Sequence, residues 1–117
     1  MKMSFEPRGE IGVVRVEEAR IDASVAIEFK DQFKDLTDGS ETNVVLDLSA
    51  VDFLDSSGLG AVVAARKLLG AGRVLELAGL TPAVGKVMTL TRMESIFPIH
   101  ADLEAALAAY GPRDPSV

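Results

Sequence analysis

The chain has 117 residues and a formal net charge of −6, so a second domain of the usual size, roughly 100–200 residues, would not fit. Hydrophobic side chains make up 48% before the 10 glycines are counted, which excludes the composition of a disordered protein. There is no cysteine and a single histidine, which excludes disulfides and cysteine-based metal sites and leaves little for acid–base relays.

The charge pattern restricts the partners. Residues 1–58 carry 6 basic and 13 acidic side chains and contain no run of Lys or Arg, so the phosphate backbone of nucleic acid would be repelled. No apolar stretch reaches the roughly 18 residues of a membrane helix, and residues 1–6 lack the apolar core of a signal peptide. We therefore expect a cytoplasmic protein that is no enzyme and that holds neither a cofactor nor a metal.

The first half of the chain predicts two strands, a helix and a buried strand. Residues 4–6 are typical of a short strand, and residues 11–16 are β-branched and favour another. Asp22 has the character of a helix N-cap. It precedes an apolar stripe at helical spacing, formed by Val25, Phe29, Phe33 and Leu36. The apolar run at 43–48 predicts a buried strand.

The second half predicts three helices and two strands. Residues 57–69 are compatible with a helix that Gly70 and Gly72 end, and residues 73–77 form the next strand. Thr81 and Pro82 favour a helix start. Residues 96–99 contain Pro98 and predict an edge strand, followed by a surface or capping His100 and a last helix at 102–110.

Strands and helices thus alternate along the chain, which predicts an α/β fold. We expect a mostly parallel mixed β-sheet of four to five strands covered by about four helices. Residues 1–111 form one domain in this interpretation, and residues 112–117 form a loose C-terminal tail.

One segment differs from routine packing: residues 47–60, with the sequence DLSAVDFLDSSGLG. It joins the end of the central strand to the start of a helix, and sites in α/β sheets collect at the carboxyl ends of strands. Asp55, Ser56 and Ser57 are all good capping residues for that helix. Gly58 and Gly60 would let another backbone approach its first turn.

Three interpretations of this segment compete. The first is a helix start with more capping residues than it needs. A nucleophilic serine is disfavoured because there is no G-x-S-x-G elbow and no nearby base. The third is a phosphoacceptor serine, since a helix N-terminus can accommodate a phosphate, although Asp55 would oppose its charge. Three acids spread over Asp47, Asp52 and Asp55 are weak support for a metal site.

The pattern D-x-S-x-V-x-F-x-D-S-S-G-L-G at 47–60 resembles the STAS domain of anti-sigma factor antagonists. The resemblance continues at Ile21-Asp22, at residues 75–84 and at residues 96–107, and so extends over almost the whole chain. Two positions depart from it. Ala19 stands where many members have glycine, and Arg92-Met93 replaces a common Gly-Leu.

The resemblance implies a STAS-like fold and a binding protein of a partner-switching circuit. In its unphosphorylated form the protein would bind an anti-sigma factor, a serine kinase of the GHKL type, and free a sigma factor. Phosphorylation of Ser56 would end that binding, and a phosphatase would restore it. Ser57 would cap the helix, while Asp22 and Asp55 would lie beside the partner surface.

Two further features bear on such an interface. In the helix after the motif, one flank carries mainly small side chains: Gly60, Val63, Ala64 and Lys67. This flank either meets a partner or packs within the same protein. On the preceding helix, Ile27 points roughly opposite to the apolar stripe, which makes it a candidate contact. The alternative function is a STAS accessory subunit of a transporter or signalling scaffold that does not switch.

Overall fold

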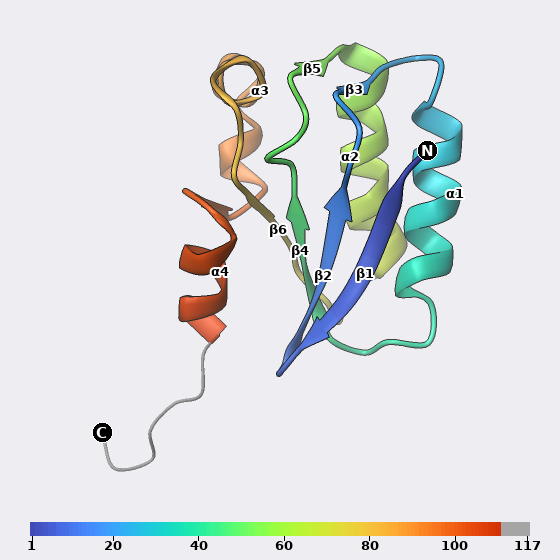
Figure 1. The fold of residues 1–117 in the computed structure, drawn as a ribbon, viewed down its shortest axis with the longest axis vertical. Coiled ribbons are helices and arrows are strands. Elements are labelled where there is room, and N and C mark those ends of the chain that lie inside the picture. Colours follow the sequence, from blue (N-terminus) through green and yellow to red (C-terminus); the bar gives the residue numbers. More distant parts are fainter. Residues whose placement is uncertain (111–117) are drawn as a thin grey trace.

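The structure is a computed structural model, and it describes residues 1–110. The tail expected at 112–117 lies outside the described residues. Five strands form one sheet in the order β1–β2–β4–β6–β7 (Figure 1). Their bounds are β1 Met3–Arg8, β2 Ile11–Val16, β4 Asn43–Asp47, β6 Leu75–Ala78 and β7 Ile99–His100. The pair β1–β2 is antiparallel and the other pairs are parallel, which confirms the predicted mixed, mostly parallel sheet.

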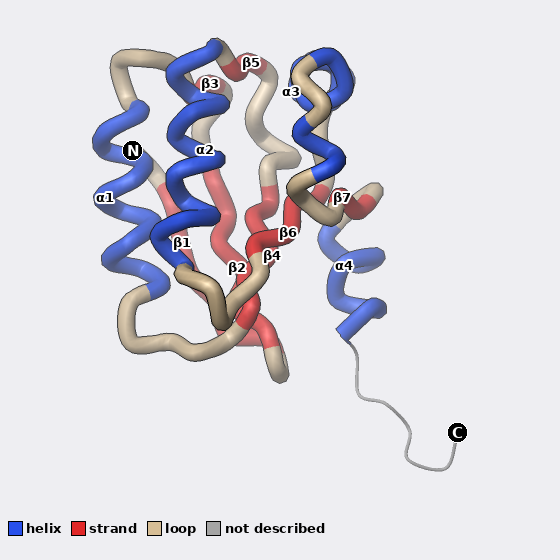
Figure 2. Tube along the Cα trace, turned by 180° about the vertical axis from the view of Figure 1, so that it is seen from behind, coloured by secondary structure: helices blue, strands red, loops and turns tan. Residues whose placement is uncertain are grey.

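The helices cover both faces of this sheet unequally. Helices α1 (Ala26–Thr37) and α2 (Ser56–Leu69) lie side by side on one face (Figure 2). Helix α4 (Leu103–Tyr110) covers part of the other face, where Ala106 packs against Ile11, Val45 and Ala78. Helix α3 (Pro82–Leu90) and the 3₁₀ turn η1 (Met93–Ser95) connect β6 to the edge strand β7.

The main core lies between the sheet and the α1–α2 pair. The predicted stripe of α1 supplies Phe29 and Phe33, which are fully buried, and their rings stack with centroids 6.1 Å apart. Every residue of β6 and all but the first of β4 are buried, because helices cover the two faces of these central strands. This explains why β4 has a continuous apolar run rather than an alternating one.

Several expected boundaries were wrong. The first helix begins at Ala26 with Val25 as its N-cap residue, so Asp22 is not its cap. The second helix begins at Ser56 and is capped by Asp55 rather than by Ser57. A short carboxylate placed one residue before the helix reaches its free N–H groups better than a serine already inside its first turn.

The sequence patterns also missed a second small sheet. Strands β3 (Arg20–Ile21) and β5 (Phe53–Leu54) pair in parallel beyond the ends of β2 and β4. Two residues are too few to show a period in the sequence, so nothing in the local pattern indicates these strands.

The structure shows what surrounds His100 and which backbone conformation Arg92 adopts. His100 was expected at the surface or as a cap, but it is half-buried and its Nε2 lies 2.5 Å from Oε1 of the buried Glu76, which ties β7 to β6. Arg92 has a backbone φ of 59°, in the left-handed region that favours glycine. The glycine that the resemblance implies at this position would suit the conformation, and in this chain arginine adopts it instead.

Candidate functional site

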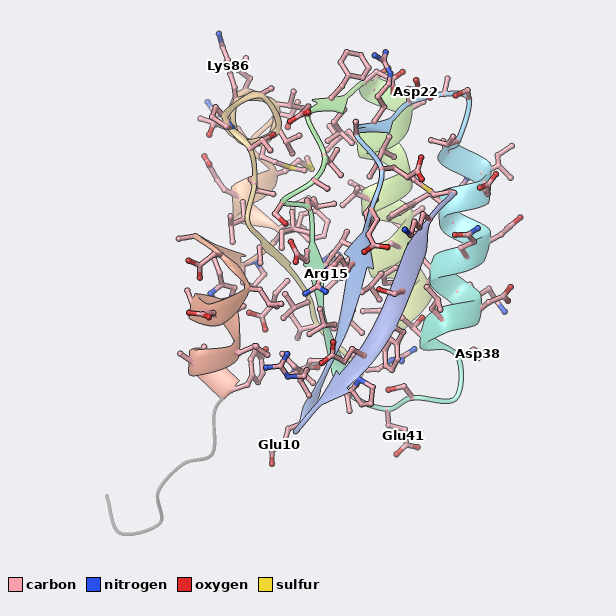
Figure 3. All side chains as sticks on the ribbon, in the orientation of Figure 1. Glu10, Arg15, Asp22, Asp38, Glu41 and Lys86 are labelled. Carbon is pink, nitrogen blue, oxygen red and sulfur yellow. The ribbon has the colours of Figure 1, made fainter. Side chains whose placement is uncertain are left out.

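The candidate site is the end of the molecule at which α1 and α2 begin. Each helix follows a strand of the small sheet, α1 after β3 and α2 after β5. The parallel pairing of Ile21 with Leu54 places both strand ends side by side, so the two helix starts meet there. Figure 3 shows Asp22 at this end of the molecule.

Asp55 joins the two helix starts through one carboxylate. Its Oδ1 accepts a hydrogen bond of 2.8 Å from the backbone N–H of Gly58, and its Oδ2 accepts one of 3.2 Å from the backbone N–H of Ala23. The first bond caps α2, and the second fixes the loop that leads into α1. Asp55 is therefore a structural clamp of the site, and these donors partly offset its negative charge.

Asp22 is held by its own loop. It accepts hydrogen bonds from the hydroxyl and the backbone N–H of Ser24, and Nε of Arg20 lies 3.3 Å from its Oδ2. The Ser24 hydroxyl contributes most to holding the pKa of Asp22 below its ordinary value. Desolvation is the next largest effect and opposes it, while Arg20 and the Ser24 backbone N–H add to the lowering. Asp22 thus remains charged beside the start of α1.

Ser56 is the first residue of α2 and is exposed. Its hydroxyl makes no hydrogen bond with any other residue of 1–110. Ser57 is exposed as well, but Asp55 already satisfies the helix start. The two serines are therefore not needed as caps, and their hydroxyl groups face solvent.

The outer face of α2 is the side turned away from the sheet. Successive residues of a helix turn by about 100°, which places Ser56 on this face together with Gly60, Val63, Ala64 and Lys67. Gly60 and Lys67 are exposed, and Val63 and Ala64 are half-buried. The structure thus brings the predicted flank into line with Ser56, on the side opposite the buried Ala65.

The two glycines of the motif have different structural roles. A Cβ atom on Gly58 would lie 1.9 Å from the carbonyl oxygen of Ile21, which no side chain can tolerate. A Cβ atom on Gly60 would meet nothing within 4 Å. The fold therefore requires Gly58 for the close approach of α2 to β3, whereas nothing within the described residues requires Gly60.

Two apolar side chains near the helix starts are exposed. Ile27 is 70% exposed on α1, as the sequence predicted, and Phe53 is 40% exposed on β5. The guanidinium carbon of Arg20 lies 4.4 Å from the centre of the Phe53 ring, a cation–π geometry. Sequence reasoning assigned no role to Phe53 or Arg20, because the pairing of β3 with β5 that joins them was not visible. The one sequence feature that could have indicated a role for Phe53 is that it is an aromatic residue within the motif, next to Leu54.

The acidic side chains of the motif are engaged in structural hydrogen bonds. Asp47 accepts hydrogen bonds from Arg15 and from the backbone N–H of Ser49, whereas Asp55 binds the helix starts. Within residues 1–110 no three His, Cys, Asp or Glu side chains gather as metal ligands would. In the same range, no helix has both the length and the apolar character needed to cross a bilayer.

Comparison with known proteins shows the family to which this chain belongs. The sequence model of the STAS domain family matches residues 2–106. A protein of Bordetella bronchiseptica named "Putative anti-sigma factor antagonist BtrV" is 39% identical over 74 residues, which cover 62% of this chain and 64% of that relative's length. The structure of an anti-sigma factor antagonist from Mycobacterium paratuberculosis is 28% identical, with a TM-score of 0.81 and 92% of each chain covered.

Two more distant structures share the fold. The Bacillus cell fate determinant SpoIIAA in its phosphorylated form is 22% identical, with a TM-score of 0.66, and the match covers 94% of this chain and all of that one. A sulfate transporter family protein from Wolinella succinogenes is 16% identical, with a TM-score of 0.73, and the match covers 87% and 85% of the two chains. At these identities the likeness shows the fold alone.

The contrast between the two glycines can be measured. We expect Gly58→Ala to lower the free energy of unfolding by about 2 kcal/mol or more, because the new methyl group overlaps the Ile21 carbonyl. Gly60→Ala should instead raise it by up to about 1 kcal/mol, as alanine is the better helix former. Urea unfolding of the two variants and the wild type gives both values. Equal effects of the two substitutions would contradict the close contact at Gly58.

Proposed function

Because the chain belongs to the STAS domain family, we propose that it is an anti-sigma factor antagonist regulated at Ser56. In its unphosphorylated form it binds an anti-sigma factor, a serine kinase of the GHKL type, and so releases a sigma factor. The observation that carries this proposal is the exposed Ser56 hydroxyl in line with the outer face of α2. The family and the antagonist relatives support the class of partner.

The contact surface we propose surrounds the two helix starts. It combines the outer face of α2 with the start of α1, where Ile27 is exposed and Asp22 is charged. An apolar side chain beside small residues can be covered closely by a partner, with about 25 cal/mol gained per Å² of apolar surface buried. Gly60 fits this role, since the fold itself leaves the space above it open.

A phosphate on Ser56 would act at this surface directly. It adds roughly −1.5 to −2 charges, and covering an unpaired dianion with a partner is very costly. A thousandfold loss of affinity requires only about 4 kcal/mol, so local blocking is sufficient. A phosphatase would return the protein to its binding form, and we place the circuit in the cytoplasm, where kinase, ATP and sigma factor meet. The chain itself supplies no catalysis in this scheme.

A second function has one observation in its favour. The same fold occurs in a sulfate transporter family protein, so an accessory STAS subunit that does not switch is the alternative. Incubation of the protein with ATP and the cognate anti-sigma kinase distinguishes the two. Mass spectrometry should find one phosphate, on Ser56, if the protein is a switching antagonist. A protein that stays unmodified while the kinase remains active would support the accessory subunit.

Substitution of Ser56 tests the switch itself. We expect Ser56→Asp to abolish binding of the anti-sigma factor, because a fixed negative charge would be buried against the partner, and Ser56→Ala to preserve it. Isothermal titration calorimetry measures both. Ser57→Asp is the matched control for charge near the helix start and should weaken binding less. Unchanged binding by Ser56→Asp would count against a switch at this position.

Substitution of Ile27 tests the extent of the surface. Ile27→Glu should leave the fold intact, since the side chain is 70% exposed and an acid is favourable in the first turn of a helix. We expect it to weaken anti-sigma factor binding by about tenfold or more, because an apolar contact is lost. Leu90→Glu on α3 is a matched control, since Leu90 is 73% exposed, and it should bind normally. If Ile27→Glu and Leu90→Glu bound the anti-sigma factor equally well, Ile27 would not be part of the contact surface.

A further inference from the structure

A pocket lies at the carboxyl end of α2, away from the candidate site. Its volume is about 410 Å³, within the range of roughly 300–1,000 Å³ that is usual for small-molecule sites. Its wall includes Arg66, Lys67, Arg73, Val74 and Ile96. Ten residues of helix separate Ser56 from Arg66, which is about 15 Å along the axis. The pocket is therefore distinct from the proposed phosphorylation site.

The wall of the pocket carries three cations and no acid. None of the three makes an ion pair with another residue of 1–110, whereas Lys2, Arg8, Arg15 and Arg20 each pair with a carboxylate. Other cations of this range are also without an ion pair, but they do not line this pocket. Cations in the last turn of a helix do favour its carbonyl end, but that end is equivalent to only about half a negative charge. The pocket thus keeps a positive charge in a chain whose net charge is −6.

Arg73 is fixed in position by backbone carbonyls. Its Nε donates to the Leu69 carbonyl at 3.1 Å, and its Nη1 donates to the carbonyls of Thr37 and Ser40 at 3.0 and 2.6 Å. These neutral acceptors join the ends of α1 and α2 without neutralising the guanidinium. A charge held in this way needs little further ordering to bind an anion. Asp38 and Glu41 line a separate hollow that also includes Arg73 and are not part of this wall.

The same pocket has an apolar side. Val74 is 46% exposed there, although it directly precedes the buried strand β6, and Ile96 is half-buried. Solvent-exposed valine beside three cations suits a ligand that has both an anionic group and an apolar body. Guanidinium groups match the geometry of phosphate oxygens, and three positive charges suit a phosphate monoester dianion better than a carboxylate.

We propose that this pocket binds a small, soluble phosphomonoester with an apolar organic part. The phosphate lies against Arg66, Lys67 and Arg73, and the organic part covers Val74 and Ile96. The site shares only Lys67 with the proposed partner surface, and its ligand is tested in the absence of the anti-sigma factor, so the two proposals can fail separately.

Binding of 1-naphthyl phosphate to the full chain, followed by NMR with ¹⁵N labelling, tests this site. We expect the amide signals of residues 66–75 to shift in a saturable way, and the affinity to fall as salt is added. Inorganic phosphate, which lacks the apolar part, and 1-naphthol, which lacks the phosphate, should each bind more weakly. No saturable shift of these signals at millimolar 1-naphthyl phosphate would overturn the proposal.

Charge variants separate a defined site from general attraction. Arg66→Gln should weaken binding of 1-naphthyl phosphate by about two- to fivefold, and Arg66→Glu should weaken it further. The matched variants Lys86→Gln and Lys86→Glu change an exposed charge on α3 (Figure 3) and should bind like the wild type. If the Arg66 and Lys86 variants lost affinity equally, the binding would depend on net charge alone and not on a defined site. If the protein bound vesicles that contain phosphatidic acid but did not bind 1-naphthyl phosphate, the pocket would be a lipid headgroup site. That result would overturn the proposal of a soluble ligand.

Discussion

The arrangement of the candidate site depends on how closely α2 begins beside β3. Gly58 makes this approach possible, since any side chain there would overlap the Ile21 carbonyl. Asp55 then uses one oxygen to cap α2 and the other to hold the loop before α1. Two segments that are about 30 residues apart in the chain thereby act as one rigid corner. The positions of Asp22, Ile27 and Ser56 relative to one another all follow from it.

The capping of α2 by Asp55 also explains why the Ser56 hydroxyl is free for modification. A helix start normally consumes the nearest polar side chain as its cap, and the motif offers three such residues in a row. Asp55 takes this role, so the serines contribute their hydroxyl groups to the surface and not to the fold. A residue that the fold does not need can be modified without loss of structure, which is what a covalent switch requires.

The sequence predicted the larger helices and strands because each is long enough to show a repeating pattern of apolar side chains. The stripe through Phe29 and Phe33 indicated the buried side of α1, and the apolar run before Asp47 indicated a strand that is covered on both faces. The same stripe predicted the exposure of Ile27. These features depend on local side-chain spacing, which a sequence displays directly.

What the sequence could not show depends on contacts between distant segments. The bond from Ala23 to Asp55 and the pairing of Arg20 with Phe53 join residues more than thirty positions apart. Capping was expected of Asp22 from its side chain and of Ser57 from the family resemblance. The actual N-cap residues are Val25 and Asp55, because capping depends on where the backbone turns, and tertiary contacts decide that. The exposed Phe53 and the pocket at Arg73 were missed for the same reason.

The direction of α2 bears on how a phosphate on Ser56 would act. The amino end of a helix carries a partial positive charge and its carboxyl end a partial negative one. A phosphate at Ser56 would therefore be favourable to the helix, just as Arg66 and Lys67 are at the other end. Repulsion by Asp55 is limited, because two backbone N–H groups already bind that carboxylate. Phosphorylation should thus leave α2 folded, so any loss of partner binding must arise at the surface, from the charge that the partner would have to cover.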